Sequence, residues 1–160
     1  MEAERNWARG RSIPLAALEP LARHPGLRLI SLQTGPGAAQ LDSVGFADRI
    51  LSFGDALDAG PSAFTDTAAI IMSLDLVISS DSAVAHLAGA LGVPVWVALH
   101  ATSEWRWLLS RSDSPWYPTM RLFRQPAAGD WQAVVSDLCR ALSEFPPGRP
   151  MPQRSGAASR

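Results

Sequence analysis

The sequence contains no lysine, and all 14 of its cationic side chains are arginines. This absence excludes two classes of enzyme, because a phosphate-binding P-loop requires its lysine and Schiff-base catalysis requires a lysine amine. The arginines are scattered, the formal net charge is −1 and the isoelectric point is about 6.3. Proteins that bind nucleic acid in a general way carry a strongly basic patch. The charge pattern therefore predicts no nucleic-acid partner.

Cysteine and long apolar runs are scarce as well. Cys139 is the single cysteine, so no internal disulfide can form and a reducing compartment is favoured. The longest apolar run, near residues 83–99, is interrupted by a histidine, two glycines and a proline, and it falls short of the roughly 20 residues that cross a bilayer. The three histidines and the cysteine show no metal-ligand spacing. We expect a cytoplasmic protein without a transmembrane segment or a metal site.

Apolar residues are abundant. Of the 160 residues, 47% are hydrophobic and 18% are charged, which is typical of a chain that folds around a core. This length predicts one domain, since domains commonly have about 100–200 residues. We expect residues 1–12 to be weakly ordered and residues 13–145 to form the domain. Residues 146–160, rich in Pro, Gly, Ser and Arg, are expected to be a disordered tail.

Between these ends, strand-like and helix-like segments alternate. Apolar-rich runs predict strands at residues 27–33, 49–53, 75–80, 94–99 and 120–124. Apolar spacing and end signals predict helices at residues 14–24, 65–74, 82–91, 104–109 and 131–145, with Thr65 or Asp66 capping the second and Asp130 capping the last. Strands that alternate with helices are typical of βαβ units. The sequence thus predicts an α/β fold, a Rossmann-like, doubly wound parallel sheet of about five strands.

One loop that follows a strand stands out. Asp81 comes directly after the strand, Ser82 stands where a helix begins, and His86 lies on the same helix face one turn later. Ala83 is small and lets a ligand approach the helix end. The first N–H groups of a helix lack intrahelical partners and carry the positive end of its dipole, so they can bind a phosphate without lysine. The alternative is that Ser82 is only an N-cap and His86 only a hydrogen-bonded core histidine.

Two other enzyme classes fit the sequence less well. A serine hydrolase places its nucleophile in G-x-S-x-G, and no glycine flanks Ser82. A dinucleotide-dependent oxidoreductase carries G-x-G-x-x-G after its first strand, whereas TGPG at residues 34–37 is only a turn without a clear helix behind it. Both classes are therefore disfavoured.

The segment after the fourth predicted strand is rich in tryptophan and arginine. Aromatic and guanidinium groups of this kind can stack on a sugar ring or a base, or they can pack internally. We expect Trp107 and Trp116 to pack. Glu104, Trp105 and Arg106 are better candidates for a binding cleft, because they follow a loop at the end of a parallel strand, where ligands bind in such sheets.

The stretch from about Phe64 to Trp131 is recognisable through DSAVAH at residues 81–86, EWRWLL at 104–109 and DSPWYPTMRLFRQ at 113–125. It resembles the C-terminal half of bacterial glycosyltransferase-like proteins related to the ADP-heptose heptosyltransferases, many of which carry N-terminal tetratricopeptide repeats. The likeness extends more loosely back to Arg11 and to LISLQTG at 29–35. It implies the C-terminal half of a GT-B enzyme, in which two Rossmann-like domains act together and the second mainly holds the nucleotide sugar.

The resemblance also implies site residues. Asp81, Ser82 and Ala83 match the family's Asp-Ser/Thr-Gly/Ala element, which binds the diphosphate and the sugar of the donor. His86 matches the family's histidine one turn later, and Gln33, at the end of the first strand, is then expected to face the cleft. GT-B enzymes require no metal in the site, so we expect no cofactor besides the nucleoside-diphosphate sugar, which is the donor substrate.

The chain departs from the family in two respects. The acceptor-side half, which supplies the general base, has no counterpart in 160 residues, and the lysine that relatives often use must be replaced by Arg11, Arg106 or another arginine. We expect a nucleotide-sugar-binding domain of a glycosyltransferase that transfers a glycosyl group to an acceptor hydroxyl and is inactive without its N-terminal half. Expected partners are the nucleotide sugar, an acceptor saccharide or protein, the missing half, or a second copy covering the cleft face. The alternative is a non-catalytic nucleotide-binding or protein-interaction module.

Overall fold

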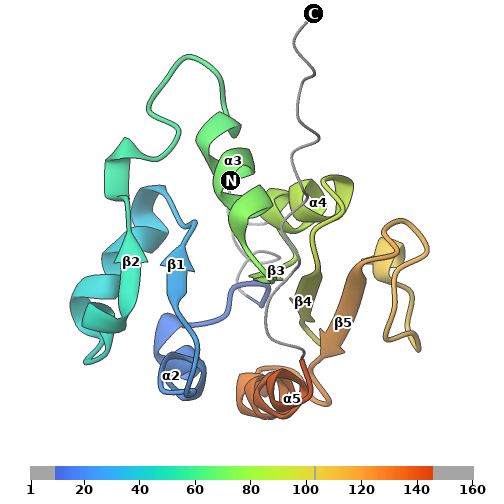
Figure 1. Ribbon diagram of the computed structural model, residues 1–160. Helices are drawn as coiled ribbons and strands as arrows, with labels where there is room; N and C mark the ends of the chain where they lie inside the picture. Colours follow the sequence, from blue (N-terminus) through green and yellow to red (C-terminus); the bar gives the residue numbers. More distant parts are fainter. Residues whose placement is uncertain (1–9, 103, 146–160) are drawn as a thin grey trace, which may run out of the picture.

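The computed structural model describes residues 10–102 and 104–145. Most of the expected weakly ordered N-terminal segment, and the expected tail at 146–160, lie outside the described residues. Figure 1 shows the arrangement of the elements. The strands are β1 (Leu29–Ser31), β2 (Ile50–Ser52), β3 (Val77–Ser80), β4 (Val95–Leu99) and β5 (Met120–Arg124); the α-helices are α2 (Glu19–Ala22), α3 (Thr65–Ser73), α4 (Ala83–Ala90) and α5 (Trp131–Ser143); the 3₁₀ helices are η1 (Leu15–Leu18), η2 (Gly35–Ser43), η3 (Ala47–Arg49), η4 (Gly54–Ala56) and η5 (Trp105–Trp107).

The strands are parallel, and the expected α/β class and strand number are confirmed. The hydrogen-bonded sheet is nevertheless divided: β1 pairs with β2, and β3, β4 and β5 form a second sheet in that order. From left to right Figure 1 shows β2, β1, β3, β4 and β5, the order of a doubly wound sheet. The single continuous sheet predicted from the sequence is interrupted between β1 and β3, because β1 and β2 have three residues each and are at most half-buried.

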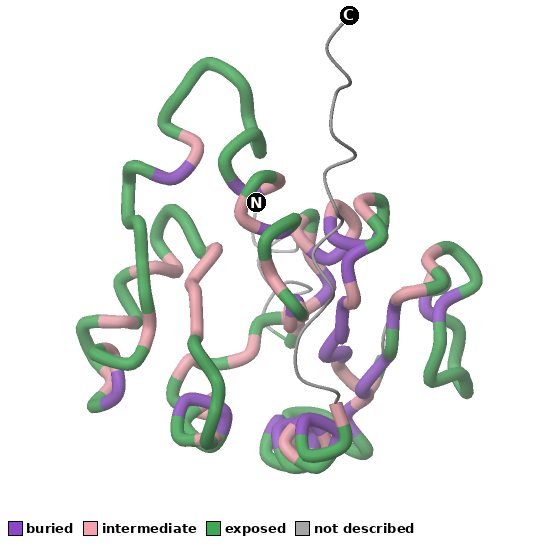
Figure 2. The backbone as a smooth tube through the Cα atoms, viewed as in Figure 1, coloured by how far each residue is buried: buried purple, intermediate pink, exposed green. Residues whose placement is uncertain are grey.

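Both faces of the three-stranded sheet are covered by helices. Successive side chains of a strand point to opposite faces, and all five residues of β4 are buried. Val95, Val97 and Leu99 pack with Ile71 of α3 and with small residues of α4, whereas Trp96 packs on the other face with α2 and α5. In Figure 1, α3 and α4 lie above the strands and α2 and α5 lie together below them; Figure 2 shows β4 as continuously buried.

Two predicted helix starts differ from the structure. The helix expected at 14–24 is η1 followed by the single turn of α2, because Pro20 has no N–H to donate one turn back. The predicted cap of α3 is wrong: Asp58 accepts hydrogen bonds from the N–H groups of Asp66 (2.8 Å) and Thr67 (3.2 Å) and from the Thr67 hydroxyl (2.6 Å). The predicted cap of α5 is confirmed, since Asp130 accepts from the N–H of Ala133 at 3.0 Å.

A turn before β5 covers the outer edge of that strand. The N–H of Leu122 donates to the carbonyl of Ser112 at 2.7 Å, and Asp113 forms an antiparallel bridge with Arg121. Arg111 donates twice to the Asp113 carboxylate, at 2.8 and 2.7 Å. These bonds raise the pKa of the Arg111 guanidinium and lower that of the Asp113 carboxyl, so the charged forms stabilise the turn.

Candidate functional site

The loop after β3 leads directly into α4. Ser82 occupies the N-cap position with extended backbone, but its side chain makes no capping hydrogen bond. Its hydroxyl instead lies 2.8 Å from the Ser79 hydroxyl. Ala83, the first residue of α4, is exposed. Ser82 therefore takes the N-cap position without a capping hydrogen bond from its side chain, and no side chain among the described residues caps the first N–H groups of α4.

A charged cluster joins this loop to the segment after β4, and it consists of Arg11, Asp81, Glu104 and Arg106. Arg11 Nη2 lies 2.8 Å from Asp81 Oδ2 and donates to the Asp81 carbonyl at 3.1 Å, while Arg11 Nη1 lies 3.3 Å from Glu104 Oε1. The other Glu104 oxygen pairs with Arg106. The Asp81 side chain is only 2% exposed. The ion pairs thus bring together three segments that are distant in sequence: the turn that carries Arg11, the loop after β3 and the segment after β4.

His86, on α4, lies among aromatic side chains. Its Nδ1 lies 3.2 Å from the hydroxyl of Tyr117, and its ring stacks on Trp107 with 5.2 Å between centroids. Trp107 is fully buried, as expected. The half-buried His86 is therefore held by a hydrogen bond and a stacked ring. These two contacts fix the orientation of its imidazole ring.

The other two tryptophans of the segment face solvent. Trp105 is 71% exposed and Trp116 is 55% exposed, and their rings meet edge to face at 6.4 Å. The expectation that Trp116 packs internally is wrong. Its indole N–H donates to the carbonyl of Arg106 at 3.1 Å, and the Arg106 guanidinium lies 5.9 Å from the Trp105 ring centre. The two exposed rings are therefore anchored next to the charged cluster.

Gln33 is not brought to the charged cluster by any described contact. It is exposed, and its side-chain amide donates to the carbonyl of Thr34 at 2.7 Å. A Cβ atom at Gly37 would lie 2.9 Å from the Gln33 side chain, so the side chain folds against its own loop. Leu32, the residue before it, packs on the cluster of buried residues under α4.

Arg124 is a positioning residue that sequence reasoning missed. The sequence interpretation places Arg121 and Arg124 together on a solvated face, but residues three apart in a strand point to opposite faces. Arg124 Nη2 donates to the carbonyls of Trp107 (3.2 Å) and Leu108 (2.7 Å). Burial lowers the pKa of the Arg124 guanidinium. Leu108 has a φ of 52°, which is costly for a branched side chain. Arg124 thus holds the segment that carries Glu104 and Arg106, and no local sequence signal marks this role.

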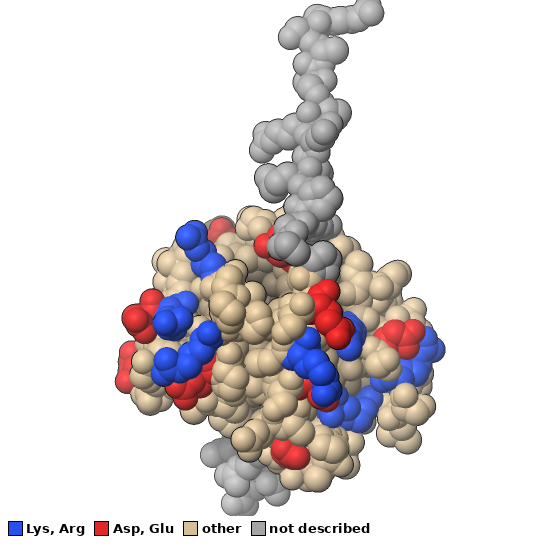
Figure 3. Space-filling model, turned by 60° about the horizontal axis from the view of Figure 1, so that its bottom comes forward, with Lys and Arg blue, Asp and Glu red and all other residues tan. Residues whose placement is uncertain are grey.

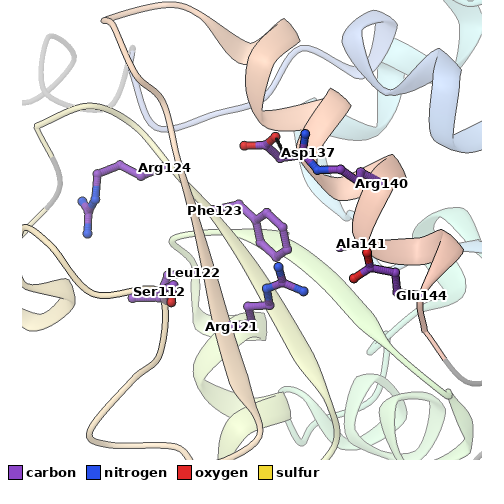
Figure 4. A pocket seen from close by; sticks show the side chains of 9 residues that line it. All are labelled: Ser112, Arg121, Leu122, Phe123, Arg124, Asp137, Arg140, Ala141 and Glu144. Carbon is purple, nitrogen blue, oxygen red and sulfur yellow. Dashed lines mark hydrogen bonds and ion pairs between the residues drawn. The ribbon is translucent and has the colours of Figure 1, made fainter.

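A separate cavity of about 240 Å³ lies between β5 and α5. Figure 4 shows Arg121 beside the Phe123 ring, with Arg140 and Glu144 on the facing helix. None of its lining residues belongs to the charged cluster.

On the face shown in Figure 3, arginines stand among acidic side chains without a continuous basic surface. We therefore place the candidate site at the charged cluster.

Two further features of the described residues bear on the site. No three His, Cys, Asp or Glu side chains in this part of the chain lie close enough together to hold a metal ion. None of the helices that the structure describes has both the length and the apolar character needed to cross a membrane.

Comparison with known proteins gives a consistent result. The model of glycosyltransferase family 9 (heptosyltransferase) matches residues 45–141, a segment that includes Asp81, Ser82, His86 and Glu104. Protein FlbA of Caulobacter vibrioides is 30% identical over 136 residues, which cover 82% of this chain and 22% of that protein. No solved structure matches. The chain spans about a fifth of its relative's length. It belongs to glycosyltransferase family 9, the heptosyltransferase family, and its fold is the Rossmann-like half of a GT-B enzyme.

Proposed function

We propose that this chain is the donor-binding part of a glycosyltransferase and that its ligand is a nucleoside-diphosphate sugar. The observation that carries the proposal is the uncapped start of α4 next to the buried Asp81. β3 and β4 are parallel neighbours, so their carboxyl ends meet at one edge of the sheet, where ligands bind in folds of this class. The family match supplies the reaction type.

In the proposed complex the diphosphate lies at the start of α4. The N–H groups there and the Ser82 hydroxyl donate to phosphate oxygens, and the helix dipole favours the negative charge. Arg106 adds a positive charge from the segment after β4, in the role that lysine has in related domains. His86 is held in place by Tyr117 and Trp107. Asp81 accepts hydrogen bonds from hydroxyl groups of the ligand.

The proposed reaction transfers the sugar to an acceptor hydroxyl. The bond between the anomeric carbon and the diphosphate oxygen breaks as the acceptor oxygen attacks, and negative charge develops on the leaving nucleoside diphosphate. Donors placed where charge develops lower the barrier. The acceptor, a saccharide or a protein, and the base that takes its proton belong to the other half of the GT-B enzyme in this proposal. The donor needs neither a metal nor another cofactor, and the cytoplasm is the proposed location.

Calorimetric titration with ADP, UDP and GDP and their sugar derivatives tests the proposal. Ser82→Ala removes one donor to a charged group, worth about 1.5–3 kcal/mol, so Kd should rise about tenfold or more. Ala83→Asp places a carboxylate at the start of α4, where it stabilises the helix but repels an anion. We expect this variant to lose binding with an unchanged or higher Tm.

Ser136→Ala, an exposed position on α5, is the matched control and should bind like the unmodified protein. Saturable binding that survives Ala83→Asp would place the ligand elsewhere. If none of these ligands binds the unmodified protein, the chain is the interaction module considered as the alternative.

A further inference from the structure

Arg11 is bound as an internal ligand by two acidic residues. Its guanidinium reaches Asp81 through both the carboxylate and the backbone carbonyl, and it reaches Glu104 through the second terminal nitrogen. These partners lie 70 and 93 positions further along the chain. The three oxygens therefore form a receptor for a planar group with several hydrogen-bond donors.

The receptor is incompletely satisfied by Arg11. Asp81 Oδ2 is buried, and although it lies 2.8 Å from Arg11 Nη2 it accepts no hydrogen bond of good geometry from the residues that the structure describes. A buried carboxylate oxygen ordinarily has such a donor. A vicinal diol carries two hydroxyl donors whose separation is similar to that of the two terminal nitrogens of a guanidinium group. One of these hydroxyls can donate the hydrogen bond that Asp81 Oδ2 lacks.

The segment that carries Arg11 is an irregular turn at the surface. Residues 10–12 form an irregular turn outside any strand or helix, Gly10 and Ser12 are exposed, and open space surrounds the position of a Cβ at Gly10. Ile13 packs with the cluster of buried residues that includes Leu21 and Trp131. Ile13 can therefore stay fixed while the preceding turn and Arg11 move away from the carboxylates.

We propose that Arg11 is a displaceable internal ligand of the Asp81 and Glu104 carboxylates, and that a vicinal diol of the incoming ligand takes its place. The second clause rests on the proposed donor-binding function; the first does not. While Arg11 is paired with the Asp81 and Glu104 carboxylates, it blocks the part of the site where the sugar is proposed to bind, which we call the sugar end. The start of α4 stays accessible to phosphate.

Chemical rescue tests the internal ligand. Arg11→Ala should have a lower Tm than the unmodified protein, and ethylguanidinium should restore it at concentrations that leave the unmodified protein unaffected. Arg28→Ala, which removes an exposed arginine just before β1, is the control and should show no rescue. An Arg11→Ala protein whose Tm does not respond to ethylguanidinium would overturn the first clause.

Calorimetry tests the displacement. Arg11→Ala should bind nucleotide sugars about tenfold more tightly, the factor for one competing charge-assisted hydrogen bond, while its affinity for ADP, UDP and GDP stays unchanged. Arg11→Lys keeps the charge but cannot bridge both carboxylates, so it should give an intermediate gain and covers the case in which the alanine variant fails to fold.

The outcomes separate the two proposals. Weaker binding of the diphosphates and of the sugars alike would make Arg11 a phosphate ligand and overturn displacement. If rescue by ethylguanidinium succeeds but no nucleotide sugar binds any variant, the internal ligand stands and the donor-binding function, with the displacement that rests on it, fails.

Discussion

Asp58 stabilises the first turn of α3 from eight positions upstream. Its carboxylate accepts three hydrogen bonds, and Asp66 returns one by accepting from the N–H of Asp58 at 3.1 Å. The pKa of Asp58 is lowered, chiefly by the Thr67 hydroxyl, although desolvation acts in the opposite direction. The unfolded chain therefore binds the proton more tightly than the folded one.

This difference predicts a pH dependence. A carboxyl with a lowered folded pKa contributes stability above its unfolded pKa, about 3.9, and the contribution is lost as the pH falls through the folded pKa. Asp58→Asn should lower Tm at neutral pH, and the difference from the unmodified protein should shrink below about pH 4. Asparagine tolerates the φ of 55° at this position, so thermal melts across pH report the lost acceptor. Asp55→Asn, at an exposed position on η4, should leave Tm unchanged.

Individual residues differ in how far the sequence predicts them. Asp130 is predictable as a cap because it adjoins the helix that it caps. Asp58 is not, since the loop that returns it to α3 leaves no periodic signal. The same limit applies to Arg11, whose pairing with Glu104 depends on the chain path between them, and to Arg124, whose acceptors are backbone carbonyls.

At the scale of elements, α4 is packed closely against the segment before β5. Gly89 is buried, and a Cβ atom there would lie 2.6 Å from Cγ and 3.0 Å from Cβ of Tyr117. Rotation of the ring about its own axis cannot move these atoms away. The close approach also fixes the hydroxyl that pairs with His86.

Gly89→Ala should therefore destabilise the protein. Overpacking commonly costs about 1–3 kcal/mol, against a gain of up to about 1 kcal/mol from alanine's helix propensity. Denaturant unfolding should show a net loss, whereas in a Tyr117→Ser background the same change should be neutral or stabilising. Gly45→Ala, where the added atom has open space, is the control. Additive effects of Gly89→Ala and Tyr117→Ser would show that the two side chains do not couple.

The strands show what hydrophobic pattern does and does not predict. β3 and β4 were predictable because their nearly continuous apolar residues are typical of strands covered on both faces. The interruption between β1 and β3 was not, since a run of apolar residues indicates burial but not which neighbour completes the ladder. β1 is only three residues long and half-buried.

For the molecule as a whole, the exposed apolar surface beside the site is the feature that bears on association. Trp105, Leu108, Leu109 and Trp116 lie on or near η5, and Leu109 is 80% exposed. Exposed apolar patches promote association. This surface borders the charged cluster. A protein partner or second copy that covers it therefore also comes close to the proposed sugar-binding part of the site.

We expect the isolated chain to self-associate through this surface. Trp105→Ser/Leu109→Ser should lower the weight-average mass measured by sedimentation at high protein concentration. Leu51→Ser/Met72→Ser removes two exposed apolar side chains from β2 and α3 instead and should leave the mass unchanged. If both pairs act equally, association is a general property of the apolar surface and not of this patch.

The turn at residues 111–113 has a consequence for how the fold can be joined to neighbours. Because Ser112 accepts from the N–H of Leu122 and Asp113 forms a bridge with Arg121, this turn occupies part of the β5 edge that a strand from another polypeptide would need. Strand addition at β5 therefore requires this turn to be displaced first. The outer side of β2, near the exposed Leu51 and Phe53, forms no such bridge within the described residues.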